Sequence, residues 1–502
     1  MKGLQSDVVW VDLLDFTPEG AALSLLSHEQ ARKYGVLPLF LLQETLYLAV
    51  ADVYDLEQQD YLRRLLAREI EPVQAEAGPL AQRLESCYRS EEHSGRTLDQ
   101  LAAQVAQVLP GSGEGAAPVA SLLQHIVTQG IHYRASDVHL ESLLDQCRLR
   151  YRIDGRLHEV SSPPPEIFPA LISRIKVMAN LDITERRRPQ DGRYTMESDQ
   201  GAYDLRVSII PYADGEGVVL RLLSRDRGVP SLSDLGFDAR TLRRYQELCS
   251  KSHGILLVTG PTGAGKSTTL YATLRGVATS DRKVATLEDP VECRLPGVCQ
   301  IPVRGDLGFG FAEGLRSLLR HDPDVVLVGE IRDRESAEIA IRAALTGHLL
   351  FSTLHTNDAC QTVTRLVDMG IAAYKVLTSL TGVLAQRLVR RLCGHCREAT
   401  SFSAQHMQAL GFPARAVEAY QPRGCELCRG IGYHGRIPCY ELLEISDEMR
   451  RLKEEELTQS RLLRLALQNG FQPFAECAYQ LFRSGLTSLE EVASLSAQRS
   501  AG

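Results

Sequence analysis

Hydrophobic and polar positions follow two kinds of pattern along the chain. In the segments "CRLRYRIDGRLHEV" (147–160), "GAYDLRVSIIP" (201–211) and "GEGVVLRLL" (215–223), apolar residues alternate with polar ones. This alternation is typical of strands that are buried on one face only. From about residue 237, continuous apolar runs such as "GILLVT" (254–259) alternate instead with helical stretches. That second pattern predicts a mostly parallel sheet.

The first 90 residues are predicted to form a small α/β unit. The segment "LPLFLLQETLYLAVADV" (37–53) predicts two short strands around a turn, and "DLEQQDYLRRLLARE" (55–69) predicts a helix. Two polar stretches, "SEEHSG" (90–95) and "PGSGEGAAP" (110–118), have the composition of linkers. The helical segment "ASLLQHIVTQGIHYRA" (120–135) then opens a second unit.

These patterns predict an α/β protein with several domains, as its 502 residues also require, since they exceed what one core usually holds. The stretch "SRDRGVPSLSDLG" (224–236) has the composition of a hinge between the second unit and the rest of the chain. We expect an N-terminal partner-docking domain at 1–90, followed by a linker at 91–117. A second N-terminal domain is expected at 118–230, and a nucleotide-binding domain at 231–502.

Composition and charge narrow the possible functions. The chain is 44% hydrophobic and 24% charged, as in ordinary globular proteins, and its formal net charge of -7 argues against a general nucleic-acid binder. No apolar run approaches the roughly 20 residues that cross a bilayer. The first residues, "MKGLQSDVVWVDLLDF", lack the basic and apolar regions of a signal peptide. We therefore expect a cytoplasmic protein that reaches a membrane only through a partner.

One glycine-rich motif predicts a site for ATP. The segment "VTGPTGAGKSTTLY" (258–271) contains G-x-x-x-x-G-K-[ST], follows an apolar run and precedes a helical stretch. Backbone N–H groups of such a loop surround the phosphates at the positive end of the helix dipole. Lys266 is expected to reach the β- and γ-phosphates, and Ser267 to hold Mg²⁺. The predicted contacts to the nucleotide are Gly260, Pro261, Thr262, Gly263, Ala264, Gly265, Lys266, Ser267 and Thr268.

Three further apolar runs end in polar residues, and ligands bind at the carboxyl ends of parallel strands. Glu288 and Asp289 follow "VATL", Glu330 follows "DVVLVG", and "HLLFSTLHT" contains Thr353 and His355. Together with the glycine-rich loop, these residues would complete a site for the γ-phosphate. Glu330 would orient or deprotonate the attacking water, or hold Mg²⁺ through a water. Glu288 is the competing candidate for the base, and His355 would sense the γ-phosphate.

Four of the twelve cysteines form two Cys-x-x-Cys pairs, "CGHC" (393–396) and "CELC" (425–428). Two such pairs complete the tetrahedral shell of four thiolates that Zn²⁺ prefers. We expect Cys393, Cys396, Cys425 and Cys428 to hold a structural zinc in an insert spanning about 390–440. A redox pair, a coincidence of spacing, and His395 as a substitute ligand are the alternatives.

Four segments also resemble a known family. "GPTGAGKSTTLY", "TLEDPVE", "LRHDPDVVLVGEIRD" and "TGHLLFSTLHTNDA" are similar, in this order, to the Walker A, Asp, Walker B and His boxes of the secretion ATPase superfamily. The resemblance extends over roughly residues 20–495. It implies a RecA-like P-loop core, a PAS-like second domain and ATP hydrolysis. A Walker B segment that ends in Gly-Glu, as at Glu330, is usual in that family.

The cysteine insert and the short N-terminal domain suggest a branch of that superfamily. Such an insert resembles type II secretion and pilus-extension ATPases, whereas retraction ATPases lack it. The short N-terminal domain resembles the type II secretion enzymes, and pilus extension is the alternative. This resemblance implies a homo-hexamer that powers pseudopilus assembly and the export of folded proteins. Its partners would be the cytoplasmic domain of a bitopic inner-membrane secretion protein and an inner-membrane platform protein.

Arginines are candidates for neutralising charge on the transferred phosphate, because a P-loop domain alone lacks such groups and ring ATPases supply them from elsewhere. Arg206 in "YDLRVS" and Arg221 in "VVLRLL" lie on predicted strands of the second unit and would face the site across the hinge. Arg316 and Arg320 are four residues apart and would share a helix face. For each of the four, a surface salt bridge is the alternative.

Two other classes of function share some of these features. A nucleic-acid motor shares a RecA-like core but is expected to carry a basic channel or stacking aromatic residues, which this negatively charged chain does not show. A nucleotide-gated scaffold would bind ATP without hydrolysing it, and the presence of both Glu288 and Glu330 argues against that. The sequence therefore favours an ATP-hydrolysing motor with no nucleic-acid partner.

Overall fold

The computed structural model describes residues 10–497, apart from residues 12, 14–17, 24, 27, 43–44, 67, 82, 85–86, 88–97, 109–115, 145, 226–227 and 410–411. The chain divides into two compact units, Met1–Asp226 and Arg227–Gly502. The first predicted linker stretch, 90–95, lies outside the described residues, as does most of the second.

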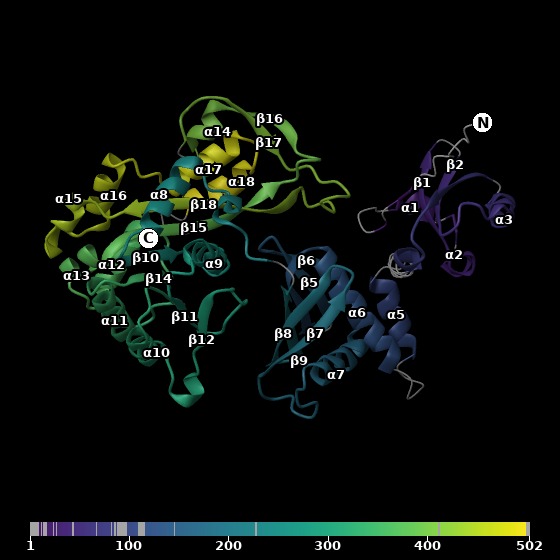
Figure 1. Ribbon diagram of the computed structural model, residues 1–502, viewed down its shortest axis with the longest axis horizontal. Coiled ribbons are helices and arrows are strands. Elements are labelled where there is room, and N and C mark those ends of the chain that lie inside the picture. The colour runs from purple at the N-terminus through teal and green to yellow at the C-terminus, as the bar shows by residue number, and fades with distance from the viewer. Residues whose placement is uncertain are drawn as a thin grey trace, which may run out of the picture. The chain divides into compact units, whose positions relative to one another are not determined.

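The N-terminal part of the first unit is a three-stranded sheet with short helices (Figure 1). Strands β1 and β2 pair antiparallel, and β2 and β3 pair parallel. The two strands and the helix that were predicted here are confirmed, and Leu37, Leu48 and Leu62 are buried in their common core. The elements are α1 (Gly20–Leu23), α2 (His28–Tyr34), β1 (Val36–Leu42), β2 (Thr45–Val50), α3 (Leu56–Leu66) and β3 (Glu69–Gln74).

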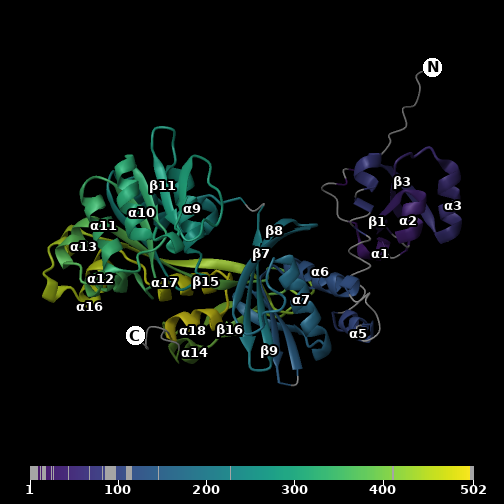
Figure 2. The same ribbon diagram turned by 90° about the horizontal axis from the view of Figure 1, so that it is seen from below.

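The rest of the first unit is a six-stranded antiparallel sheet, ordered β6-β5-β4-β9-β8-β7. Helices α6 and α7 pack side by side on one face of it (Figure 1 and Figure 2). The three alternating segments are confirmed as β5 with β6, β8 and β9. The elements are α5 (Leu98–Val108), α6 (Ala116–His132), β4 (Ala135–Leu143), β5 (Gln146–Ile153), β6 (Arg156–Ser161), α7 (Phe168–Met178), β7 (Gln190–Ser198), β8 (Gly201–Tyr212) and β9 (Gly215–Ser224).

The predicted linker 91–117 differs from the structure, because α5 occupies its middle. Leu98, Ala102 and Val105 of α5 are buried, and their spacing places them on one helix face. This face packs against α6. The segment is therefore a folded part of the second domain, and the linker composition lies on either side of it.

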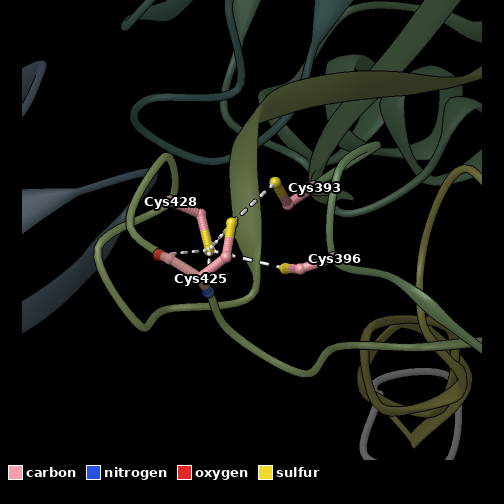
Figure 3. A group of neighbouring side chains, drawn as sticks. All are labelled: Cys393, Cys396, Cys425 and Cys428. Atoms are coloured by element: carbon pink, nitrogen blue, oxygen red, sulfur yellow. Dashed lines mark hydrogen bonds between the residues drawn. The ribbon is translucent and has the colours of Figure 1, made fainter. Parts of the chain in front are cut away.

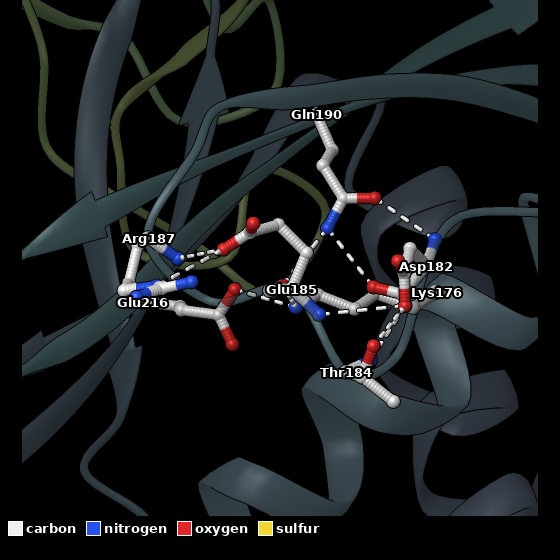
Figure 4. Close-up of polar contacts among 7 residues, drawn as sticks. All are labelled: Lys176, Asp182, Thr184, Glu185, Arg187, Gln190 and Glu216. Carbon is white, nitrogen blue, oxygen red and sulfur yellow. Dashed lines mark hydrogen bonds and ion pairs between the residues drawn. The ribbon is translucent and has the colours of Figure 1, made fainter.

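A buried ion pair fixes α7 to strand β9 (Figure 4). Lys176 of α7 is 1% exposed, and its Nζ donates to Glu216 Oε1 on β9 at 2.6 Å and to Glu185 O at 2.7 Å. Gln190 Nε2 donates to Asp182 O at 2.9 Å and to Glu185 O at 3.0 Å, which holds the loop between α7 and β7. The strand that carries Arg221 is thus anchored to the helix layer.

The second unit is built on a seven-stranded sheet ordered β12-β11-β13-β14-β10-β15-β18. All neighbours in it are parallel except β15 and β18, so the prediction of a mostly parallel sheet is confirmed. Every residue of β10 and β14 is buried, with Ile255 and Leu257 of β10 in one core and Leu256 and Val258 in the other. The strands are β10 (Gly254–Thr259), β11 (Val284–Glu288), β12 (Val298–Pro302), β13 (Val325–Val328), β14 (Leu349–Leu354), β15 (Leu380–Leu392) and β18 (Tyr433–Glu444).

Helices cover both faces of this sheet. Residues of α8 and α9 contribute to one of the two cores, and residues of α11, α12 and α13 contribute to the other. The helices are α8 (Ala239–Cys249), α9 (Lys266–Val277), α10 (Phe311–Leu318), α11 (Arg334–Leu345), α12 (Ala359–Asp368) and α13 (Ala373–Ser379).

The cysteine-containing insert leaves the sheet at the end of β15 and returns to it at β18. It holds β16 (Glu398–Phe402), α14 (Ala404–Ala409) and β17 (Val417–Gln421). After β18 follow α15 (Asp447–Arg450), α16 (Gln459–Gln468), α17 (Phe474–Arg483) and α18 (Leu489–Ala497). Within the described part of the chain, no helix is long and apolar enough to span a membrane.

Candidate functional site

The glycine-rich loop lies between the buried strand β10 and helix α9, in the middle of the sheet. Gly260 and Gly265 have φ angles of 145° and 85°, which side-chain-bearing residues rarely adopt. A Cβ atom added to Gly260 would lie 2.3 Å from the Gln386 carbonyl oxygen, and one added to Gly265 would lie 2.8 Å from Gln386 Nε2. Glycine is therefore required at both positions by backbone conformation and by a close neighbour.

Gln386 on β15 supports this loop and was not predicted from the sequence. Its Nε2 donates to Ala264 O at 2.7 Å, and its Oε1 accepts from Thr269 Oγ1 at 2.7 Å. The side chain is buried, so both of its polar ends are satisfied by the loop and by α9. The available signal was a glutamine inside the otherwise apolar run "GVLAQRLV" (382–389).

Lys266 lies at the mouth of the loop. Its Nζ donates to Gly260 O at 2.8 Å and to Pro261 O at 3.1 Å. Burial lowers the pKa of Lys266, while the nearby Glu330 carboxylate raises it. Ser267 and Thr268 follow in the first turn of α9, and both are exposed. The predicted phosphate-binding residues are thus gathered at one end of β10.

Glu330 follows β13 at the same edge of the sheet. A Cβ atom on the preceding Gly329 would lie 3.1 Å from Leu287 O on β11. A glycine at this position therefore lets the backbone just before Glu330 pass close to β11. Glu330 Oε1 lies 2.5 Å from Arg332 Nη2, and Oε2 lies 3.7 Å from His355 Nε2. The structure therefore brings Glu330 and His355 together, beside Lys266.

His355 is half-exposed after β14. Its pKa is lowered first by burial and then by the positive charge of Lys266. The imidazole is consequently neutral at pH 7, when it can donate from one nitrogen and accept at the other. Thr353 lies nearby on β14 and donates to Gly329 O at 2.8 Å, which ties β14 to the segment that carries Glu330.

Glu288 at the end of β11 has a different environment, since it is buried among hydrogen-bond donors. Thr286 Oγ1 donates to its Oε1 at 2.5 Å, Gln300 Nε2 donates to the same oxygen at 3.1 Å, and Tyr271 Oη donates to Oε2. Burial and the hydrogen bond to Glu288 raise the pKa of Tyr271 well above its usual range. Asp289, the next residue, is exposed.

The candidate arginines lie in two separate places. In the second unit, Arg316 pairs with Glu335, and Arg320 Nη1 donates to Arg316 O at 3.0 Å. The contact of Arg316 is the surface salt bridge that was the alternative for this residue, whereas Arg320 donates to a backbone carbonyl. In the first unit, Arg206 and Arg221 are cross-strand partners on β8 and β9.

The four predicted zinc ligands form one cluster (Figure 3). The Sγ–Sγ distances are 3.9 Å for Cys393–Cys425, 3.6 Å for Cys396–Cys428 and 3.7 Å for Cys425–Cys428. A Zn–S bond of about 2.3 Å in a tetrahedral shell places sulfur atoms about 3.8 Å apart, so the cluster fits a zinc ion. His395 is exposed and is not part of this group.

Two of the four thiols have shifted pKa values, and the shifts are opposite: burial raises the pKa of Cys396, whereas the pKa of Cys428 is lowered. Burial raises the pKa of Cys428, but hydrogen bonds outweigh that effect: the N–H groups of Cys425 and Gly432 donate to its Sγ at 3.2 Å each, and the thiols of Cys396 and Cys425 also contribute. The resulting pKa is about 7. The separations between the sulfur atoms are much longer than a disulfide bond, and all four cysteines are free.

Comparison with known proteins identifies the family. Residues 112–494 match the family described as type II/IV secretion system protein, which is well over half of the chain. The chain belongs to this family. Residues 6–94 match the MshEN domain. The resemblance to secretion ATPases that the four boxes indicated is therefore confirmed, and so is the α/β fold class with its RecA-like core.

Relatives from two kinds of system match along most of the chain. The type II secretion system protein E of Dickeya dadantii is 42% identical over 468 residues, 92% of this chain and 88% of the relative. The type IV pilus assembly ATPase PilB of Thermus thermophilus is 37% identical over 96% of this chain, which spans only 55% of that relative's length. The solved structure of the ATPase DotB from Yersinia pseudotuberculosis shares the fold, with a TM-score of 0.59 over 75% of this chain and 94% of that one, at 22% identity.

Proposed function

We propose that this secretion ATPase hydrolyses Mg²⁺-bound ATP to power pseudopilus assembly, and thereby the export of folded proteins, in a type II secretion system. The observation that carries the proposal is the meeting of Lys266, Glu330 and His355 at the mouth of the glycine-rich loop. The type II assignment is supported by the near full-length match to a type II secretion protein E. A pilus-extension ATPase is the second candidate, supported by the match to the pilus assembly ATPase of Thermus thermophilus.

In this proposal the loop residues grip the triphosphate. The N–H groups at the start of α9 face the phosphates, and Lys266 exchanges its two carbonyl partners for phosphate oxygens. Ser267, exposed in the first turn of α9, would hold Mg²⁺, which supplies charge neutralisation for the β- and γ-phosphates. The binding of ATP therefore does not depend on either of the carboxylates.

We assign the role of orienting or deprotonating the attacking water to Glu330. Arg332 pairs with its carboxylate, His355 lies 3.7 Å from it, and the Glu330 side chain remains partly exposed. Glu288, by contrast, accepts hydrogen bonds from Tyr271, Thr286 and Gln300 inside the protein. A carboxylate that is already engaged by three donors is poorly placed to accept a proton from water, so Glu288 is assigned a supporting role.

Arg206 and Arg221 are proposed to complete the site from a neighbouring copy in a homo-hexamer. Their two charges would stabilise the transferred phosphate, which the loop and one lysine neutralise only in part. The two arginines lie side by side on β8 and β9, and the Arg221 side chain is 58% exposed. This arrangement suits recognition of phosphate by the planar guanidinium groups.

A concentration series tests the shared site. Turnover per chain should rise as the purified protein is concentrated and chains assemble into rings. Arg221→Ala should lower turnover about a hundredfold or more at all concentrations, because arginines that serve a transferred phosphate have effects of about 10³ or larger. Phosphate release and sedimentation, measured on the same samples, provide the check. Dilute monomers that hydrolyse ATP as fast per chain as the ring would contradict the shared site.

A truncation tests membrane docking. We propose that residues 1–90 dock on the cytoplasmic domain of a bitopic inner-membrane protein and thereby place the ATPase at the membrane, near the platform protein. Because Lys266, Glu330 and His355 all lie beyond residue 200, removing residues 1–90 should preserve basal ATP hydrolysis. The truncated protein should leave the membrane fraction and fail to support secretion. A truncated protein that still sediments with membranes would place the docking surface elsewhere on the chain.

A gene deletion distinguishes a type II secretion ATPase from a pilus-extension ATPase. Deleting the gene should stop the export of folded proteins and leave surface pili unchanged if the type II assignment is correct. Loss of pili with normal protein export would instead support the pilus-extension candidate. Complementation with the Lys266→Ala variant, which cannot grip the triphosphate normally, controls for effects of the protein's mere presence.

A further inference from the structure

Five charged residues form a line across the six-stranded sheet of the first unit. Each residue of the line is the cross-strand partner of the next, and partners in an antiparallel pair project from the same face. Four of the five are arginines. The line runs through Arg193 on β7, Arg206 on β8, Arg221 on β9, Asp137 on β4 and Arg152 on β5.

This line lies on the face of the sheet opposite the hydrophobic core. Val138 and Leu220, which alternate with members of the line, are fully buried on the side covered by α6 and α7. Like charges directly opposite each other destabilise a sheet. The repulsion among the three consecutive arginines is offset in part by Asp137, which pairs with Arg221.

Asp137 is the one carboxylate in the line, and it is buried. Its Oδ1 accepts from Arg221 Nε at 3.0 Å, and its Oδ2 lies 3.7 Å from Arg152 Nε. Ser136 Oγ also donates to Oδ2, at 2.8 Å, which fixes the orientation of the carboxylate. The contact with Asp137 uses the Nε of Arg221, which is the guanidinium nitrogen nearest the backbone.

The two terminal amino groups of Arg221 are not used in this contact. They form the part of the guanidinium that can bind two phosphate oxygens at once. Because 58% of the Arg221 side chain is exposed, this end is presented to the outside of the unit. Asp137 thus acts as a clamp that limits the rotation of Arg221 without covering its phosphate-binding end.

We propose that Asp137 is a positioning residue for ATP hydrolysis, which acts by holding Arg221 so that its terminal amino groups meet the transferred phosphate. The proposal rests on the role assigned to Arg221 in the proposed function. It adds a residue that itself touches neither nucleotide nor water. Pre-organisation of this kind affects the rate of the chemical step more than the binding of ATP, since the loop around Lys266 supplies the binding.

The test uses Asp137→Asn in the full-length chain. Asparagine keeps the shape and one acceptor oxygen but loses the charge that fixes Arg221. We expect kcat to fall about tenfold to a hundredfold, with nucleotide affinity and ring assembly unchanged, because misplacing a catalytic group by about 1 Å costs about 10²-fold. Glu141→Gln is the matched control: Glu141 lies on the same strand and face and pairs with Arg150 at 2.5 Å. The control should retain normal kcat.

A double variant separates positioning from general stability. If Asp137 acts only through Arg221, then Asp137→Asn combined with Arg221→Ala should be no slower than Arg221→Ala alone. Multiplied losses would overturn the proposal, and so would a normal kcat for Asp137→Asn. If Asp137→Asn does not fold, Arg221→Lys replaces it, because lysine keeps the charge but has no Nε–H to be held. Arg221→Lys should be as slow as Arg221→Ala, and a normal kcat for it would overturn the proposal.

Failure of the proposal and failure of the proposed function give different results. If Arg221→Ala hydrolyses ATP at the normal rate, then the role assigned to Arg221 is wrong, and the positioning role proposed for Asp137 is wrong as well. If Arg221→Ala is slow and Asp137→Asn is normal, the role of Arg221 stands and only the clamp is wrong.

Discussion

Glu330→Gln should reduce the rate of ATP hydrolysis by about a thousandfold, within the range of about 10²–10⁴ that general acid–base catalysis contributes. Glutamine has nearly the same shape but can neither accept a proton nor attract the attacking water as a carboxylate does. ATP binding should be almost unchanged, since the triphosphate is held by the glycine-rich loop and Lys266. Single-turnover hydrolysis and equilibrium binding of ATP, measured on the same preparation, separate the two effects.

Glu288→Gln is the matched control for this result. The Glu288 side chain is buried and accepts hydrogen bonds from Tyr271, Thr286 and Gln300. In glutamine an NH2 group replaces one of the two accepting oxygens, so two donors would oppose each other there. Such a mismatch costs about 1–3 kcal/mol of stability. We therefore expect a lower unfolding temperature but a much smaller loss of turnover than for Glu330→Gln. The reverse order of the two activities would assign the base to Glu288.

A second comparison concerns binding. Lys266→Ala removes a positive charge that contacts the triphosphate, and it should weaken both binding and turnover. If Glu330→Gln weakened ATP binding as strongly as Lys266→Ala does, then Glu330 would act on the nucleotide or its metal ion and not on the water.

Local patterns were sufficient for the parts of the fold that carry the nucleotide site. The continuous apolar run before Gly260 and the glycines themselves define the loop, because both are set by neighbours in sequence. Strands β4 and β7 were not predicted, since one face of their sheet is polar and their segments "ASDVHLESL" and "QDGRYTMES" carry few apolar residues. Helix α5 was overlooked because linker composition surrounds it on both sides.

The sequence did not reveal which of Glu288 and Glu330 is better placed to act as the base. Both follow apolar strands and are alike in local context. Their difference arises from Tyr271 on α9 and Gln300 on β12, which belong to other elements than the strand that carries Glu288. Gln386 is a similar case: it lies more than 100 residues from the loop that it supports. Contacts of this kind depend on strand order, which a single sequence does not reveal.

The four-cysteine cluster was predictable because its members come in two short, regular pairs, but its place in the fold was not. Cys393 directly follows β15, and its N–H donates to Gly432 O just before β18 at 3.0 Å. The neighbouring Leu392 N–H donates to Leu486 O at 2.9 Å, which connects the same point to the C-terminal helices. The cluster therefore closes the end of the long β15–β18 pair.

Replacing Cys393 and Cys425 together by serine should remove one zinc per chain and unfold the region 390–440. The expected effect is large, because structural zinc sites contribute about 10–16 kcal/mol of apparent binding free energy, which exists only in the folded state. Zinc content by elemental analysis and protease sensitivity of the insert give the two measurements. Cys293→Ser with Cys299→Ser is the control, since these cysteines lie outside the cluster, and it should retain zinc. The site is closed, so the loss should appear as misfolding and not as a selective defect in hydrolysis. A properly folded wild-type preparation without zinc would contradict the assignment of the four thiolates to a metal.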